Sequence, residues 1–167
     1  MIIRKAINTD LENIMKMYKS CVAGMIKSGI DQWDDTYPDT ETISQDLENQ
    51  TYYVTEEKGE IIGGINIDQN QDPTYLDINW KDASNQFLVV HRLAVKEENW
   101  GDKVGKALMI FAEETILEDG LKSIRLDTYS GNPKAMEFYR RLGYSELGTI
   151  DLKPNKDKYH CFEKIIK

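Results

Sequence analysis

This sequence of 167 residues has only two cysteines, only four prolines and no long apolar run. These scarcities argue against a disulfide-rich protein, a disordered or fibrous chain and a membrane-spanning protein. Its two cysteines, Cys21 and Cys161, lie far apart without a Cys-x-x-Cys spacing, so they indicate neither a disulfide framework nor a zinc site. No stretch approaches the roughly 18 apolar residues of a membrane span, and residues 1–5 precede no apolar signal segment. We therefore expect a cytoplasmic protein with no membrane partner and no metal.

Positive charge is also in short supply. The 21 basic residues face 29 acidic ones, and the net charge is −8. Such a surface repels phosphate backbones and weakly attracts cations. We expect no nucleic-acid partner, whereas a cationic amine substrate is compatible with this charge.

What the chain does have is a regular alternation of apolar patterns typical of a globular α/β (α+β) fold. With 40% hydrophobic and 30% charged residues, it has the composition of a folded domain. Neither a repeat nor a linker divides residues 1–167, so we expect one domain. The patterns predict the order β-α-α-β-β-β-α-β-α-β-β, with strands at residues 2–6, 51–56, 60–68, 86–95, 123–128, 144–150 and 159–165.

Four local signals set the predicted helix ends. Thr9 and Glu12 have the spacing of a capping box before the first helix, and Asp39 or Thr40 caps the second. Gly120 is a C-terminal cap of the third helix, which begins near residue 104. The pair Asn132-Pro133 predicts the start of a fourth helix, and that helix ends at Gly143.

The strongest chemical signal is the junction between the apolar strand 86–95 and the helix from residue 104. The connecting run is Trp100-Gly101-Asp102-Lys103-Val104-Gly105. Backbone N–H groups of such a loop and of a helix start form an anion site that suits a pyrophosphate. An ordinary strand-to-helix turn is the alternative, because glycine-containing junctions of this kind are common.

A second signal lies in residues 130–144, which run from Ser-Gly-Asn-Pro to Leu-Gly-Tyr. Tyr139 lies one turn before the end of the predicted helix. Its side chain could face either the core or a cleft.

Taken together, the two segments resemble the GNAT superfamily of N-acetyltransferases. The coenzyme loop of that family, Gln/Arg-x-x-Gly-x-Gly/Ala, falls on residues 100–105, and residues 132–144 resemble a later family motif. Two positions depart from the pattern: Trp100 replaces the usual Gln or Arg, and Lys103 replaces the first motif glycine. Lys103 cannot adopt glycine-only backbone angles cheaply, yet its ammonium group could lie near a pyrophosphate.

The resemblance implies a mixed, mostly antiparallel central sheet of about seven strands, flanked by helices and containing a splayed central strand pair. It also implies that acetyl-CoA is the acyl donor and that a primary amine of a small molecule or peptide attacks it directly in a ternary complex. The implied coenzyme-binding residues are Leu93, Ala94, Val95, Trp100, Gly101, Asp102, Lys103, Val104, Gly105, Lys106, Asn132 and Tyr139.

An acid and a base both assist this reaction, because the amine attacks only when neutral and the thiolate leaves more readily when protonated. By the resemblance, Tyr139 is the acid. Many family members use a glutamate as base, but Val89 occupies that position here. His91 resembles the histidine that precedes Leu-Ala-Val in arylalkylamine acetyltransferases, and an imidazole changes charge near neutral pH. A core histidine is the alternative.

Three aromatic residues lie in the two long loops expected to border the acceptor amine. These are Trp33 and Tyr37 in residues 29–38 and Trp80 in residues 69–84. Aromatic faces can hold an ammonium group. Packing is an equally weighted alternative for all three.

Two other functions fit parts of the pattern. One is a non-catalytic sensor module that binds acyl-CoA, which the missing glycine and glutamate would permit. The other is a nucleotide-binding α/β domain, but the chain lacks Gly-x-x-x-x-Gly-Lys-Ser/Thr and an early Gly-x-Gly-x-x-Gly. The acceptor amine, the preferred acyl chain and the choice between monomer and homodimer are left open.

Overall fold

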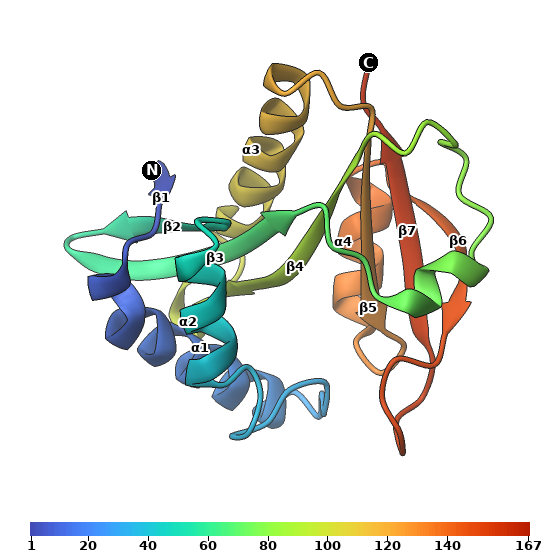
Figure 1. The fold of residues 1–167 in the computed structure, drawn as a ribbon. Coiled ribbons are helices and arrows are strands. Elements are labelled where there is room, and N and C mark those ends of the chain that lie inside the picture. The colour runs from blue at the N-terminus through green and yellow to red at the C-terminus, as the bar shows by residue number, and fades with distance from the viewer. The chain divides into compact units, whose positions relative to one another are not determined.

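The computed structural model describes all residues from 1 to 167 (Figure 1). Seven strands form one mixed sheet in the order β1-β2-β3-β4-β5-β7-β6. The strands are β1 (Ile2–Lys5), β2 (Tyr52–Glu57), β3 (Glu60–Asp68), β4 (Phe87–Val95), β5 (Ser123–Tyr129), β6 (Ser145–Ile150) and β7 (Tyr159–Ile165). The helices are α1 (Leu11–Lys27), α2 (Thr40–Glu48), α3 (Val104–Glu118) and α4 (Pro133–Arg141). Short 3-10 turns occur at η1 (Asn8–Asp10), η2 (Pro73–Asp77) and η3 (Glu97–Asn99).

The strand order and pairing confirm the predicted fold class. Strands β1, β2 and β3 pair antiparallel in sequence, and β7 pairs antiparallel with both β5 and β6. Between β4 and β5 the pairing is parallel, and it joins Phe87, Leu88 and Val89 to Ser123, Ile124 and Arg125. The sheet is therefore mixed and mostly antiparallel, as expected.

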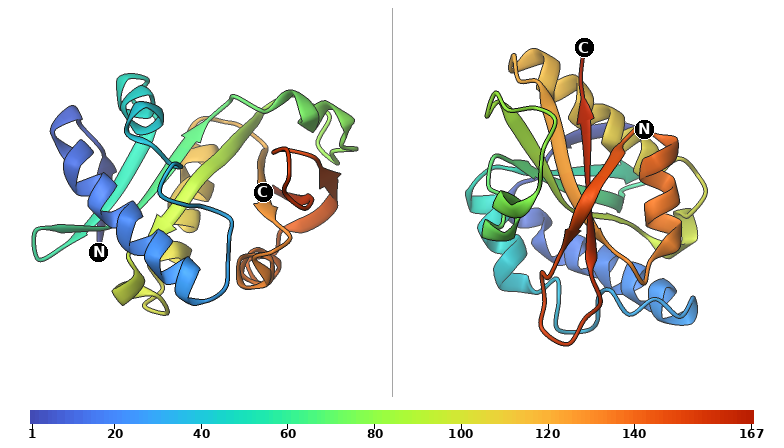
Figure 2. Two further views of the ribbon diagram at one scale, coloured as in Figure 1. Left: turned by 90° about the horizontal axis from the view of Figure 1, so that it is seen from below. Right: turned by 90° about the vertical axis from the view of Figure 1, so that its right-hand side faces the viewer.

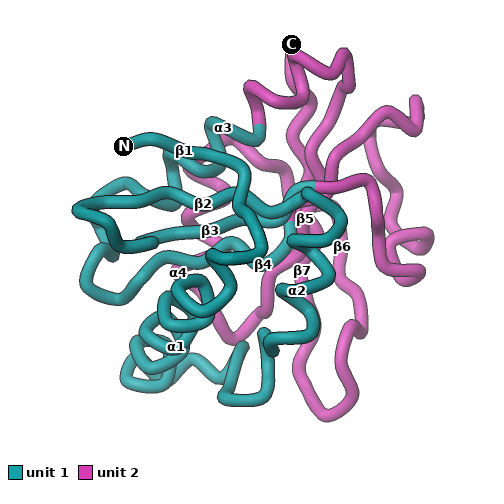
Figure 3. The backbone as a smooth tube through the Cα atoms, turned by 60° about the vertical axis from the view of Figure 1, so that its left-hand side comes forward, with its two compact units in different colours: residues 1–67, 91–112 teal, residues 68–90, 113–167 magenta.

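The chain forms two compact units, and neither is continuous in sequence (Figure 3). Unit 1 comprises residues 1–67 and 91–112, and unit 2 comprises residues 68–90 and 113–167. Strand β4 and helix α3 each contribute residues to both units. The expectation of a single domain stays a prediction.

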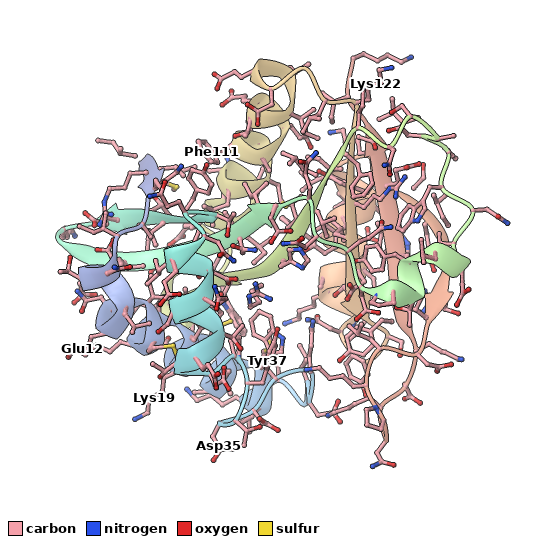
Figure 4. All side chains as sticks on the ribbon, in the orientation of Figure 1. Glu12, Lys19, Asp35, Tyr37, Phe111 and Lys122 are labelled. Carbon is pink, nitrogen blue, oxygen red and sulfur yellow. The ribbon has the colours of Figure 1, made fainter.

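In unit 1, helices cover both faces of β1, β2 and β3. Helices α1 and α2 lie on one face, and the first part of α3 lies on the other (Figure 1). Tyr52 points toward α1 and α2 and is fully buried, whereas its neighbour Tyr53 packs its ring against Phe111 of α3 at 4.9 Å. Phe111 is labelled on α3 in Figure 4. Alternate residues of β2 thus serve opposite faces, as the two-residue period of a strand requires.

The start of α1 differs from the prediction. Asp10 is the residue before the helix, and no side chain caps it, so the capping box of Thr9 and Glu12 is wrong. Asp10 instead accepts hydrogen bonds from the backbone N–H of Ile7 and from the guanidinium of Arg4. An ion pair with β1 has replaced a local cap, and a short sequence pattern does not report such a contact between elements.

Unit 2 is built around β5, β7 and β6. The η2 segment and α4 lie on opposite faces of these strands, as both views in Figure 2 show. On the η2 face, Tyr75 and Ile78 join a buried cluster with Tyr129, Tyr159 and Cys161. On the α4 face, Tyr139 packs its ring against Phe162 of β7.

The other predicted helix ends are confirmed. Asp39 accepts a hydrogen bond from the N–H of Thr42 at 2.9 Å and caps α2. Asn132 does the same for Ala135 at the start of α4, at 3.1 Å. Gly120 and Gly143 follow α3 and α4 with φ angles of 69° and 87°, the left-handed conformation that favours glycine at helix ends.

Both cysteines are buried and free. Cys21 lies on α1 within the core of unit 1, and Cys161 lies on β7. Burial raises the pKa of the Cys21 thiol to about 11 and that of Cys161 to about 12. Both thiols are therefore neutral near pH 7, and neither bonds to the other.

Candidate active site

The run from β4 to α3 holds most of the predicted coenzyme residues, and all of it from His91 to Ala112 belongs to unit 1. After Val95, the turn η3 leads into an exposed loop of Gly101, Asp102 and Lys103. Helix α3 then begins at Val104. The first N–H groups of a helix have no partner within it, so this loop and helix start present backbone donors at one place.

Two residues of this loop have left-handed backbone angles. Gly101 has a φ of 91° and Lys103 a φ of 66°. Lys103 therefore adopts the backbone conformation that would be cheaper for the glycine expected at this position. Its side chain and that of Lys106 are exposed. The loop thus has the shape that a glycine would allow, with two cationic side chains added.

Trp100 replaces the Gln or Arg of the family pattern, and its side chain has a structural task. The indole N–H donates to the Val95 carbonyl at 2.8 Å. The ring lies so close to Gly24 of α1 that a Cβ atom there would come within 2.7 Å of it. Trp100 consequently fixes the loop to the end of β4 and to α1, and a coenzyme contact by this residue stays a prediction.

The three strand residues predicted to pair with pantetheine differ in their backbone surroundings. A Cβ atom on Gly63 of β3 would lie 3.3 Å from the Ala94 carbonyl oxygen, and the Lys96 N–H donates to Ile62 at 2.8 Å. Because backbone groups alternate along a strand, those of Leu93 and Val95 face away from β3. The Val95 carbonyl already accepts a hydrogen bond from the Trp100 indole. Leu93 therefore fits the pairing prediction better than Ala94 or Val95 does.

The remaining residues of the predicted coenzyme loop are placed by α3. Val104 is buried beneath the helix start, next to Gly63 of β3, so only its backbone could reach a ligand. Gly105 is partly exposed, and Asp102 is exposed. Asp102 adds a negative charge at the helix start, which opposes an anion there.

In unit 2, Tyr139 lies on the buried face of α4. Its ring contacts Phe138, Tyr144 and Phe162, with centroid distances of 5.2, 6.0 and 5.9 Å. Burial, followed by the charge of Asp127, raises the pKa of the Tyr139 phenol well above its usual range. The group is therefore protonated at neutral pH, which is the form that a proton donor needs.

Asn132 has a structural role as well as the coenzyme role that the resemblance implies. Its side-chain oxygen accepts the Ala135 N–H and so caps α4. The residue is buried. Its contact with a coenzyme stays a prediction. Because the side-chain oxygen caps the helix, this contact would have to use the side-chain NH2 group.

His91 is the first residue of β4 that belongs to unit 1. It is partly exposed, unlike Phe87 to Val90 before it, which are buried. The first half of β4 is therefore buried, whereas most of its second half is partly exposed. A partly exposed histidine suits the base role better than a core histidine does, and the role stays a prediction.

The aromatic residues predicted to border the acceptor have different surroundings. Trp33 is buried in the core of unit 1, edge-on to Tyr18 at 5.8 Å, which favours the packing alternative. Tyr37 is partly exposed, and its hydroxyl accepts a hydrogen bond from Arg92 at 3.4 Å. Trp80 already has a cation on its ring, because the Arg125 guanidinium lies 4.5 Å from its centroid.

Two clusters of polar residues were not expected from the sequence. In unit 1, Arg92 of β4 pairs with Asp46 of α2. In unit 2, Arg125 of β5 lies near Glu163 of β7, and the Glu163 carboxylate accepts the N–H groups of Lys81 and Asp82. Each pair joins residues far apart in sequence, so no local motif could reveal it.

Two kinds of site are absent from the described residues. No three or more His, Cys, Asp or Glu side chains are grouped so that they could hold a metal ion. None of the helices combines the length and apolarity that crossing a membrane requires.

Comparison with known proteins identifies one family. Its model, described as the acetyltransferase (GNAT) family, matches residues 11–144. The chain is 28% identical to S-(2-succino)cysteine N-acetyltransferase of Bacillus subtilis over 153 residues, which cover 89% of this chain and 87% of that protein. It is 26% identical to S-alkylcysteine N-acetyltransferase of the same organism over 148 residues, or 86% of this chain and 78% of that one.

A solved structure shares the fold. The GNAT-family acetyltransferase of Streptococcus agalactiae superimposes with a TM-score of 0.84 and 24% identity, over 99% of this chain and 95% of that one. At this level of identity the likeness concerns the fold.

Proposed function

Because this chain belongs to the acetyltransferase (GNAT) family and is an acyltransferase, we propose that it transfers an acetyl group from acetyl-CoA to the primary amine of a small molecule. Two relatives are named as N-acetyltransferases of S-substituted cysteines. We therefore propose an S-substituted cysteine as the first acceptor to test. The homologues share about a quarter of their residues with this chain, so another amine of similar size fits the same proposal.

The observation that carries the proposal is the backbone conformation at residues 101–104. Two left-handed residues, Gly101 and Lys103, precede the start of α3. N–H groups in such a turn and at a helix start form an anion-binding concavity. The Asp102 N–H already donates to the Asn99 carbonyl at 3.2 Å, so the other N–H groups of the turn and of the helix start would bind the anion. Lys103 and Lys106 are exposed there and add positive charge. The residues present therefore fit the pyrophosphate of a coenzyme A thioester, with Asp102 as the one opposing charge.

The strand before the loop supplies the second part of the fit. The backbone groups of Leu93 face away from β3, and they would pair with the pantetheine arm. An N–H group at this position would also polarise the thioester carbonyl as negative charge develops on its oxygen. Holding amine and thioester together contributes several kcal/mol to the rate in reactions of this kind, about 7 kcal/mol or more in well-oriented cases.

Two side chains would move protons. Tyr139 would donate to the departing sulfur, since its raised pKa keeps the phenol protonated. His91 would accept a proton from the ammonium group, directly or through water. A general acid or base of this kind contributes on the order of a hundredfold or more to the rate.

The test is a thiol-release assay with acetyl-CoA and a panel of amines. The panel contains S-(2-succino)cysteine, S-alkylcysteines, polyamines, arylalkylamines, aminoglycosides and short peptides. We expect turnover with at least one S-substituted cysteine and little with peptides. If only another small amine is acetylated, acetyl transfer stands and the S-substituted cysteine is the wrong acceptor. Binding of CoA without turnover on any amine would favour the sensor alternative and contradict the proposal.

A further inference from the structure

Arg92 interrupts β4 with a backbone angle that is rare for its residue type. Its φ is 52°, in the left-handed region, although it lies inside a strand and is not a glycine. Such a conformation is unfavourable for a residue with a Cβ atom, and it persists only where the surroundings hold it. The contacts of Arg92 must therefore hold it in this conformation.

Two tyrosines hold the backbone of Arg92. The Tyr18 hydroxyl on α1 donates to the Arg92 carbonyl oxygen at 2.7 Å. The Tyr52 hydroxyl on β2 donates in turn to the Tyr18 hydroxyl at 2.8 Å. Both residues are almost completely buried, and burial raises the pKa of each phenol, so both hydroxyls stay protonated as donors. A chain of two hydroxyls thus runs from β2 to the carbonyl of the strained residue.

The guanidinium of Arg92 is held as firmly as its backbone. Its Nε and Nη2 atoms donate to the two carboxylate oxygens of Asp46 at 2.9 and 2.7 Å. The side chains of Arg92 and Asp46 are only 15% and 9% exposed. A third nitrogen, Nη1, donates to the hydroxyl of Tyr37, which Figure 4 labels in the segment between α1 and α2. Paired donors on a carboxylate fix direction as well as distance.

These contacts join four parts of unit 1 at one residue. They come from α1, from α2, from β2 and from the segment between α1 and α2. The next residue in the chain is Leu93, whose backbone groups face away from β3. The angle at Arg92 sets the direction of the peptide group between Arg92 and Leu93, and therefore the direction of the Leu93 N–H.

We propose that Tyr18 and Asp46, with Tyr52 behind Tyr18, are positioning residues for acetyl transfer. They hold Arg92 in the left-handed conformation, and this aims the Leu93 backbone at the thioester. The inference rests on the proposed function, because it needs a thioester at Leu93. It assigns a role in the reaction to three buried side chains that the proposed chemistry does not itself use.

A role confined to stability would give a different result. If the hydroxyl chain served only the core, removal of one hydroxyl would lower the melting temperature and leave kcat of the folded protein unchanged. Misalignment of the reacting groups lowers kcat, because a displacement of about 1 Å can cost on the order of a hundredfold. The separation of kcat from KM, measured on folded protein, therefore distinguishes the two roles.

The experiment compares three tyrosine-to-phenylalanine variants, each of which loses one hydroxyl and little volume. Tyr18→Phe removes the donor to Arg92, Tyr52→Phe removes the outer link, and Tyr53→Phe is the matched control on the opposite face of β2. We expect kcat to fall about tenfold or more in Tyr18→Phe, by a smaller factor in Tyr52→Phe and less than about twofold in Tyr53→Phe. KM for acetyl-CoA should change by less than about threefold. Amide exchange of the peptide spanning residues 88–96 should accelerate in the first two variants alone.

The outcomes separate this inference from the proposed function. If the parent turns over acetyl-CoA and Tyr18→Phe and Tyr52→Phe keep the parental kcat, the positioning role is wrong and the proposed function stands. If the parent neither binds nor uses acetyl-CoA, the proposed function fails and this inference fails with it. Should Tyr18→Phe not fold, Tyr52→Phe and Asp46→Asn decide, and parental kcat in both would overturn the role.

Discussion

Arg92 in unit 1 and Arg125 in unit 2 both lie on strands, and the guanidinium group of each is largely buried. They differ in what their contacts stabilise. Arg92 has a left-handed backbone, and its guanidinium has two short hydrogen bonds to one carboxylate. Arg125 has no such backbone strain. Its guanidinium lies between the rings of Trp80 and Phe87, at 4.5 and 4.0 Å from their centroids, and 3.7 Å from Glu163.

The difference separates a contact that aims the backbone from one that only holds a loop. At Arg92, the surroundings maintain a conformation that the strand would not adopt alone. At Arg125 the strand is regular, and the guanidinium group holds residues 80–82 in place. It also donates a hydrogen bond to the Asp82 carbonyl. Changes near Arg92 should therefore affect turnover, and changes at Arg125 should affect stability.

The largest effect is expected from Arg125→Met. The substitution keeps much of the apolar contact with Trp80 and Phe87 but leaves the buried carboxylate of Glu163 without its cation. Removing one partner of a buried pair costs roughly 3 kcal/mol of unfolding free energy. Urea unfolding measures this loss, and kcat per folded molecule should stay parental. Arg140→Met, at an exposed pair with Glu146, is the control and should cost less than about 1 kcal/mol. A fall in kcat without a loss of stability would remove the distinction between the two arginines.

Gly105→Glu should come next, through binding. A glutamate at the start of α3 opposes an anion and blocks the close approach of the backbone. Loss of two hydrogen bonds to a charged group, at about 1.5 kcal/mol each, corresponds to on the order of a hundredfold in affinity. Calorimetry with CoA measures it. Ile110→Glu places the same charge on an exposed position of α3 and should bind like the parent. Equal affinity for CoA in both variants would contradict coenzyme binding at this loop.

Tyr139→Phe should lower kcat at least about tenfold with little change in coenzyme affinity, since it removes a proton donor and keeps the ring. Because the pKa of Tyr139 is raised, the protonated form persists to higher pH. The parent should therefore lose no activity through this group below about pH 10, the usual pKa of a tyrosine. Steady-state kinetics against pH, after a melting curve of each form, tests both statements. A Phe variant with parental kcat, where chemistry limits the rate, would leave Tyr139 as a packing residue.

The smallest effect on turnover is expected from His91→Ala, and it should depend on pH. Turnover should fall by about tenfold at neutral pH and recover as the pH rises, because the amine then loses its proton without help. CoA affinity should stay nearly parental. The measurement is kcat/KM for the same amine from pH 6.5 to 9.5. Full activity across this range would contradict the base role, and a collapse of the melting temperature would indicate that His91 serves packing.

Local sequence signals were most reliable where local chemistry decides the structure. Asn132-Pro133 predicted the cap of α4, and Gly120 and Gly143 predicted two helix ends, because these contacts span only a few residues. The capping box at Thr9 failed because an ion pair between Arg4 and Asp10 prevailed there. The succession of helices and strands along the chain followed from apolar patterns that repeat with the period of each element.

The candidate site was predictable only in part. The glycine pattern at residues 101–105 located the loop, but the left-handed angle of Lys103 could be inferred only from a resemblance. The angle at Arg92 had no signal in the sequence, since it depends on hydroxyls that lie 40 and 74 positions away along the chain, at Tyr52 and Tyr18. The cation on Trp80 was likewise invisible, because Arg125 follows it by 45 residues.

The burial of both thiols has a practical meaning for the assay. A thiol reagent reacts with thiolates, and both Cys21 and Cys161 have pKa values raised to about 11 and about 12. The folded protein should therefore add almost no colour of its own when such a reagent detects released CoA near pH 8. Unfolded molecules would expose two thiols each, so the background in the absence of amine reports the unfolded fraction of every variant in the same cuvette.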